Sequence, residues 1–197
     1  MNNNDLLEDY SPSGASFTEI CETVERGERV QFFRGEFAKA EYANLNKRVY
    51  PLSVLREAYE KILPEVKNRR LVGQLSHPST PMVEPEKIAV YFPELELKEN
   101  SLVGTAFPSS TPNGEIVKGL LKDGVKLGFS TRSTGSVAPY NGPLGEGLVV
   151  VKPGLTLRAI DIVFNPSAGT FPDVVTESAI YLGQTTKFSA VWDKLFG

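Results

Sequence analysis

Hydrophobic side chains recur at helical spacing in two segments of the chain. In residues 51–66 the apolar positions lie three or four residues apart, so they share one face of a helix. They are Leu55, Ala58, Tyr59, Ile62 and Val66. Pro51 suits the first helical position, and Pro64 should end or kink the helix. A second helix is predicted over residues 113–122, with Thr111 as its N-cap and a buried stripe of apolar residues. That stripe is Ile116, Val117, Leu120 and Leu121.

Several other segments mix β-branched, aromatic and polar residues in the manner of strands. They are residues 28–40, 70–76, 87–97, 102–107, 125–131, 147–151 and 155–164. Residues 17–25 are predicted to form a short helix, and the hydroxyl-rich run after residue 131 an irregular turn. Helices and strands do not alternate regularly. We therefore predict an α+β fold, a curved antiparallel sheet or β-barrel flanked by helices.

The ends of the chain are less patterned than its middle. Its 197 residues suit one domain with tails. We predict a flexible N-terminal arm over residues 1–16, one domain over residues 17–170 and a C-terminal segment over residues 171–197. The last segment would dock on the body of the protein or be cleaved off.

Composition narrows the possible partners. The formal net charge is −3 and no basic face stands out, which argues against nucleic acid as a partner. No apolar run approaches the roughly 18 residues of a membrane span. Cys21 is the only cysteine, so neither an internal disulfide nor a thiolate metal site can form. We expect no metal and no cofactor.

Candidate chemistry is densest in residues 126–137, KLGFSTRSTGSV. Ser130 can act as a nucleophile there if a base takes its proton. His77 is the only histidine, so an imidazole base for Ser130 has to be His77. Two plainer readings stay open: a histidine before a proline can be a structural or surface residue, and a hydroxyl-rich run can be only a turn.

Asp161 is the candidate for orienting that imidazole, because a carboxylate on the second ring nitrogen fixes the tautomer. It lies in an otherwise apolar run, so it needs a partner if buried. Alternatively it pairs with a lysine or arginine, or points to solvent from an edge strand. The oxyanion would be held by N–H groups after Ser130, with help from Arg132. A surface salt bridge is the alternative for Arg132.

Four segments together carry a resemblance to a known family. They are residues 46–51 (NKRVYP), 73–78 (GQLSHP), 128–136 (GFSTRSTGS) and 161–167 (DIVFNPS). In this order and at similar spacing, the set resembles the prohead core proteases of tailed bacteriophages. These are capsid maturation serine proteases related in fold to the herpesvirus assemblins. The resemblance covers roughly residues 30–170, so the predicted domain would be a protease domain with a herpesvirus-protease-like fold.

The resemblance implies a role for each candidate residue. The nucleophile of the family falls on Ser130 and its histidine on His77. Asp161 falls on a strand typical of the family and would be the third member. Thr131 and Arg132, directly after the nucleophile, would serve the oxyanion or the substrate.

This chain departs from the family beside the proposed site. Gln74, Thr131 and Ser133 stand where the family commonly has Glu, Ser and Gly. These positions flank the proposed catalytic residues and do not replace them. The departures leave open the oxyanion geometry and the role of position 74.

The resemblance also implies substrates and a setting. Scaffold or core proteins and capsid proteins would be cut inside the immature phage head, in the host cytoplasm, by a homo-oligomer. Such proteases favour cleavage after glutamate with Leu or Ile two residues before it. Residues 6–8, Leu-Leu-Glu, fit this pattern and predict self-cleavage after Glu8; residues 175–177, which end at Glu177, fit it less well.

Two other functions stay open from the sequence. The first is a non-enzymatic capsid assembly or scaffold protein whose loops are purely structural. The second is a hydrolase or transferase that uses Ser130 on small molecules.

Overall fold

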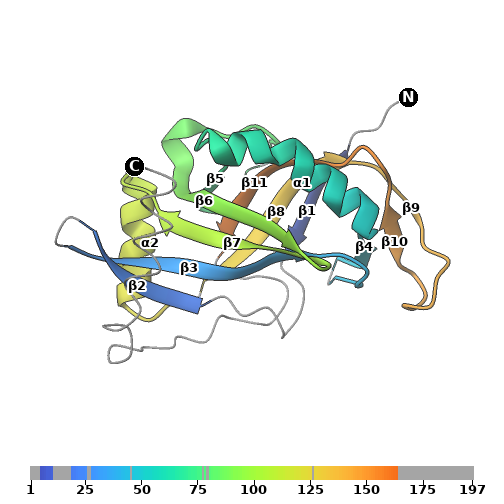
Figure 1. Cartoon of the computed structure of the whole chain (residues 1–197), viewed down its shortest axis with the longest axis horizontal. Coiled ribbons are helices and arrows are strands. Elements are labelled where there is room, and N and C mark those ends of the chain that lie inside the picture. Colours follow the sequence, from blue (N-terminus) through green and yellow to red (C-terminus); the bar gives the residue numbers. More distant parts are fainter. Residues whose placement is uncertain are drawn as a thin grey trace.

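Three β-sheets and two α-helices make up the described part of the chain (Figure 1). The computed structural model describes residues 5–10, 19–25, 28–44, 46–76, 78, 80–125 and 127–163, with side chains from residue 31 onward. The largest sheet has the strand order β2-β3-β7-β6-β5. Its strands are β2 (Glu19–Glu25), β3 (Glu28–Lys39), β7 (Ser101–Pro108), β6 (Ile88–Lys98) and β5 (Val72–Gln74).

The two smaller sheets have three strands each. One has the order β1-β8-β11, with β1 (Asp5–Tyr10), β8 (Gly128–Gly135) and β11 (Thr156–Val163). The other has the order β4-β10-β9, with β4 (Arg48–Val49), β10 (Val149–Val151) and β9 (Val137–Pro139). The β4–β10 pair is parallel, whereas the pairs within the other two sheets are antiparallel.

One isolated bridge joins the two sheets that matter for the site. Leu75, just past β5, pairs in parallel with Ile162 of β11. The five-stranded sheet therefore leads into β11 and β8, and the two form one curved surface. Within the described residues the strands do not close into a barrel. The predicted α+β fold with a curved antiparallel sheet is confirmed; the barrel is not formed.

The apolar core lies between this curved sheet and the helices. Helix α1 (Leu52–Lys67) contacts β6 and β11, and α2 (Pro112–Lys122) contacts β6 and β7 (Figure 1). Four phenylalanine rings from β3, β6 and β8 meet edge to face in the core. They are Phe33, Phe37, Phe92 and Phe129. A 3-10 turn, η1 (Pro85–Lys87), leads into β6.

The helices predicted over residues 51–66 and 113–122 are confirmed. The α1 stripe is buried at Leu55, Ala58, Ile62 and Val66, and Pro64 lies inside the helix without ending it. In α2, the Thr111 hydroxyl accepts a hydrogen bond from the Gly114 N–H, which is the predicted cap. Ile116 differs from the expected stripe, because its side chain is 48% exposed. Neither α-helix in the described part of the chain is long and apolar enough to cross a membrane.

Two predicted elements were wrong. Residues 17–25 were expected to be helical, but Glu19–Glu25 pairs with β3 along its whole length. The hydroxyl-rich run was expected to be an irregular turn, but β8 continues through it to Gly135. In both cases neighbouring strands supply the backbone partners, and pairing overrides a weak local preference.

The tails are described only in part. Asp5–Tyr10, inside the predicted N-terminal arm, forms β1 and pairs with β8. The predicted C-terminal segment, residues 171–197, lies outside the described residues. The boundaries at residues 16 and 170 stay predictions.

Candidate functional site

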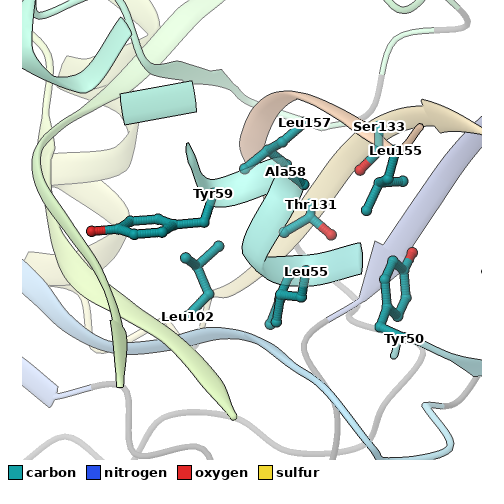
Figure 2. A pocket seen from close by; sticks show the side chains of 10 residues that line it. Tyr50, Leu55, Ala58, Tyr59, Leu102, Thr131, Ser133, Leu155 and Leu157 are labelled. Atoms are coloured by element: carbon teal, nitrogen blue, oxygen red, sulfur yellow. The ribbon is translucent and has the colours of Figure 1, made fainter. Parts of the chain in front are cut away.

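Strand β8 carries the candidate nucleophile and has two different faces. All of its side chains are buried, and alternate residues point to opposite sides. Phe129 belongs to the apolar core. Thr131 and Ser133 line a small, mostly apolar pocket beneath α1 (Figure 2). Ser130 and Arg132 alternate with these residues, so they belong to the face that looks away from the core.

The pocket in Figure 2 is a poor place for acid–base chemistry. Its lining residues carry no acid, lysine, arginine or histidine. They are Ala38, Tyr50, Leu55, Ala58, Tyr59, Leu102, Thr131, Ser133, Leu155 and Leu157. Thr131 is therefore beside Ser130 in sequence but presents its side chain to the opposite face. Any help from Thr131 at the Ser130 face would therefore have to come from its backbone.

Ser130 and Asp161 are cross-strand partners in the β8–β11 ladder. Both side chains are 0% exposed. Directly opposed residues place their Cβ atoms about 4.5–5.5 Å apart on the same face. The structure thus brings together two of the three predicted catalytic residues, which are far apart in the chain.

Arg132 and Asp161 form a buried ion pair. Arg132 Nε lies 3.0 Å from Asp161 Oδ2, and Nη2 donates to Oδ1 at 3.2 Å, with both side chains 0% exposed. The ladder sets Arg132 opposite Ala159, so Asp161 is its diagonal neighbour, within reach of a long side chain. Of the alternatives weighed for Asp161, a basic partner is the one observed. The alternative of a surface salt bridge for Arg132 is wrong, because the pair is fully buried.

The guanidinium of Arg132 also binds two main-chain carbonyls downstream of position 77 and one side chain upstream of it. Arg132 Nη1 donates to Thr80 O at 2.8 Å and to Met82 O at 2.9 Å. Nη2 also donates to Gln74 Oε1 at 3.3 Å. Arg132 therefore contacts the chain both before and after position 77.

Gln74 completes this set of contacts from the end of β5. Its backbone N–H donates to Asp161 Oδ1 at 2.8 Å. Its side-chain amide donates to Glu84 O at 3.0 Å. The Gln74 side chain is 0% exposed. Sequence reasoning noted position 74 only as a departure from the family, because no local pattern reveals a contact with a strand so distant in the chain.

The backbone that leads into position 77 is anchored to β11. The Ser76 N–H donates to Ile162 O at 2.7 Å, one residue after Asp161. Ser76 has a φ of 69°, in the left-handed region that residues other than glycine seldom occupy. Such conformations persist only where the surroundings hold them, and they gather at functional sites.

The other predicted site residues are described incompletely. His77 and Glu177 lie outside the described residues. Glu8 is in β1, where its register partner is Arg132, and Tyr10 is the partner of Ser130. Among the residues the structure describes, no group of three or more His, Cys, Asp or Glu side chains could hold a metal ion.

Known proteins with similar sequences and structures share one description. Residues 18–180 match the family model described as prohead core protein serine protease. The prohead core protein protease of Enterobacteria phage T4 is 31% identical over 161 residues, which are 79% of this chain and 73% of that protein. The solved structure of the bacteriophage T4 capsid assembly protease, gp21, matches with a TM-score of 0.68 and 26% identity, over 81% of this chain and 98% of that chain. The family match includes both β8 and β11.

Proposed function

This chain belongs to the family of prohead core protein serine proteases, and from this premise we propose that it is a serine endopeptidase with Ser130 as nucleophile and His77 as general base. Membership makes it a prohead maturation protease. The identity of the catalytic groups, the cleavage preference and the order of events are the proposal.

One observation supports the pairing of His77 with Ser130 above the others. The Ser76 N–H binds Ile162 O, and the neighbouring Asp161 is the ladder partner of Ser130. Consecutive Cα atoms lie about 3.8 Å apart and adjacent strands about 4.8 Å apart. The described backbone on the N-terminal side of His77 therefore ends within about two strand spacings of the β8 backbone at Ser130.

The proposed reaction is acyl transfer in two halves. His77 takes the proton of the Ser130 hydroxyl as its oxygen attacks the peptide carbonyl, and the proton then passes to the leaving amine. In the second half His77 activates a water, which releases the acyl group and restores Ser130. Backbone N–H groups after Ser130, among them that of Thr131, would hold the oxyanion.

The roles of Asp161 and Arg132 in this scheme follow from their contacts. Asp161 lies beside Ser130 in the ladder, which supports its proposed role as the carboxylate that orients His77. Its carboxylate also accepts from Arg132 and from the Gln74 N–H. Arg132 has its terminal nitrogens on Thr80, Met82, Gln74 and Asp161, so any help to the oxyanion from Arg132 would be indirect.

The substrates and setting belong to the same proposal. We expect scaffold or core and capsid proteins to be cut inside the immature phage head, after glutamate, by a homo-oligomer of this chain. Self-cleavage after Glu8, and less readily after Glu177, follows from the same preference. That nucleic acid, membranes and cofactors take no part stays a prediction.

Replacing single side chains tests the proposed function. Ser130→Ala and His77→Ala should each lower cleavage of the cognate scaffold protein by on the order of 10⁴–10⁶-fold. Ser133→Ala is the matched control, because it makes the same change in the same strand but on the pocket face. Cleavage would be followed by gel electrophoresis and mass spectrometry.

The other outcomes separate the alternatives. A wild-type protein that leaves the scaffold protein intact and binds it unchanged would identify a capsid assembly or scaffold protein. Turnover of small esters without peptide cleavage would identify a hydrolase of another class. Equal cleavage by wild type and Ser130→Ala would remove Ser130 from the mechanism.

A further inference from the structure

We propose that Arg132, Asp161 and Gln74 form a positioning clamp that fixes the chain on both sides of position 77 against the Ser130 face of β8. This inference rests on the proposed function, because it gives these residues a task in holding a base near the nucleophile. Arg132 and Gln74 act through the backbone that they hold and do not themselves touch the reacting atoms, whereas Asp161 serves the clamp in addition to its proposed role beside the base.

The contacts of Arg132 reach from the Ser130 face of β8 to the segment that follows position 77. Arg132 is on the same face of β8 as Ser130, two positions away, and its Nη1 reaches Thr80 O and Met82 O. Both acceptors are main-chain carbonyls, so these contacts fix the path of the chain and not one side chain. The described segment that follows position 77 is therefore fastened over the face that carries the nucleophile.

The segment before position 77 is held by the same group of residues. Asp161 Oδ1 accepts from the Gln74 N–H at 2.8 Å and from Arg132 at 3.2 Å. Gln74 in turn binds Arg132 through Oε1 and Glu84 O through its amide. The ion pair thus binds the chain at Gln74, Thr80 and Met82, and the Gln74 side chain binds it at Glu84.

The energetics favour a positioning role over a purely stabilising one. Arg132, Asp161 and Gln74 are all 0% exposed. Removing two charges from water is costly, and apolar residues of similar volume commonly stabilise a fold equally well. What apolar residues cannot supply is a planar fork with five fixed donors, which holds a carboxylate and two carbonyls at once. Ser76, with its φ of 69°, is a strained position that this arrangement would help to maintain.

The main test replaces the fork by a point charge. Arg132→Lys keeps the charge, but its single nitrogen cannot serve the carboxylate and both carbonyls. We expect kcat for a peptide substrate and the rate of fluorophosphonate labelling of Ser130 to fall about 10²-fold, with KM changed less than about threefold. Arg158→Lys, an exposed position in the neighbouring strand β11, is the matched control and should behave as wild type.

A second pair of variants separates positioning from folding. Arg132→Met combined with Asp161→Leu removes both charges together, so it should melt nearer to wild type than Asp161→Asn does. Because Asp161→Leu also removes the proposed catalytic carboxylate, the double variant tests folding alone, and labelling is compared in Arg132→Lys and Gln74→Met. Gln74→Met removes no charge and should lower labelling by a smaller factor, without loss of the cooperative melting transition.

The outcomes distinguish failure of this inference from failure of the proposed function. Wild-type protein that is never labelled at Ser130 overturns the proposed function, and the inference with it. Labelling of wild type at Ser130, with Arg132→Lys and Gln74→Met reacting at the wild-type rate, overturns the clamp alone. The clamp would also be overturned if, across all variants, the loss of activity simply paralleled the loss in melting temperature.

Discussion

At the scale of single residues, the site depends on one very close approach. A Cβ atom on Gly73 would lie 1.8 Å from the carbonyl oxygen of Ile160. Only glycine lets β5 come this near to β11. That approach is what brings Gln74 and Ser76 to Asp161 and Ile162. The candidate site therefore requires glycine at position 73, in addition to the side chains of its other residues.

Gly73→Ala should therefore separate β5 from β11. We expect a loss of several kcal/mol in the free energy of unfolding, because a backbone carbonyl cannot give way by that distance. Gly119→Ala in α2, where a Cβ would meet nothing within 4 Å, is the control. It should stabilise the protein by about 0.5–1 kcal/mol. Urea unfolding of both variants measures the difference, and equal stabilities would contradict the packing described.

The buried ion pair gives a second prediction at this scale. Asp161→Asn leaves the Arg132 guanidinium buried without its counter-charge. Breaking one side of a buried pair costs about 3–5 kcal/mol. Thermal and urea unfolding should show this loss, whereas Glu115→Gln, which breaks the exposed Lys118–Glu115 pair, should change stability by less than about 1 kcal/mol. A neutral Asp161→Asn would show that water reaches the guanidinium.

At the scale of elements, β8 is the strand that joins the candidate site to the rest of the protein. Its one face belongs to the core and the α1 pocket, and its other face carries Ser130 and Arg132. It is also a central strand, with β11 along one edge and β1 along the other. The N-terminal segment that contains the proposed cleavage position therefore lies, as β1, along the strand of the proposed nucleophile.

Self-cleavage after Glu8 follows from this pairing together with the proposed preference. Ser130→Ala protein alone should keep its N-terminus, and addition of active protein should convert it to a chain that begins at Asp9. Because β1 pairs along its whole length with β8, cleavage should be slow until that ladder opens. Intact-mass spectrometry checks the product. An N-terminus that survives prolonged incubation with active protein would count against the preference or the position.

At the scale of the whole molecule, the core and the site share one curved sheet. Phe129 packs against Phe33, Phe37 and Phe92 and directly precedes Ser130. The Leu75–Ile162 bridge then connects the large sheet to the strand beside the nucleophile. Loss of core packing should therefore also alter the geometry of the site around Ser130.

Phe129→Ala tests this link between core and site. A buried phenylalanine truncated to alanine costs about 3–5 kcal/mol. Because its neighbour is Ser130, fluorophosphonate labelling should slow even at temperatures where the variant stays folded. Ile116→Ala, at a position 48% exposed, should alter stability by no more than about 0.5 kcal/mol. Unchanged labelling in a destabilised Phe129→Ala protein would show that packing of the core does not affect the reactivity of Ser130.

Much of the fold could be read from local pattern because local physics decides it. Apolar spacing and the Thr111 cap identified both α-helices, and β-branched runs identified most strands of the five-stranded sheet together with β11. The failures are residues 17–25 and the run after residue 131. The first pairs with β3, the next strand along the chain, and the second pairs with the distant strands β1 and β11. A short polar segment has no strong preference of its own, so its partner decides its structure.

The sequence by itself determined the family, the two α-helices, the start of the strand that carries Ser130 and the single histidine, because each of these rests on short contiguous motifs or on composition. It also showed that Asp161, in an apolar run, would need a partner. Only the tertiary structure decided that the partner includes Arg132 and that Gln74 joins them, since these residues meet across β5, β8 and β11. Buried charges choose among partners by three-dimensional proximity, and the order of residues along the chain does not encode that proximity locally.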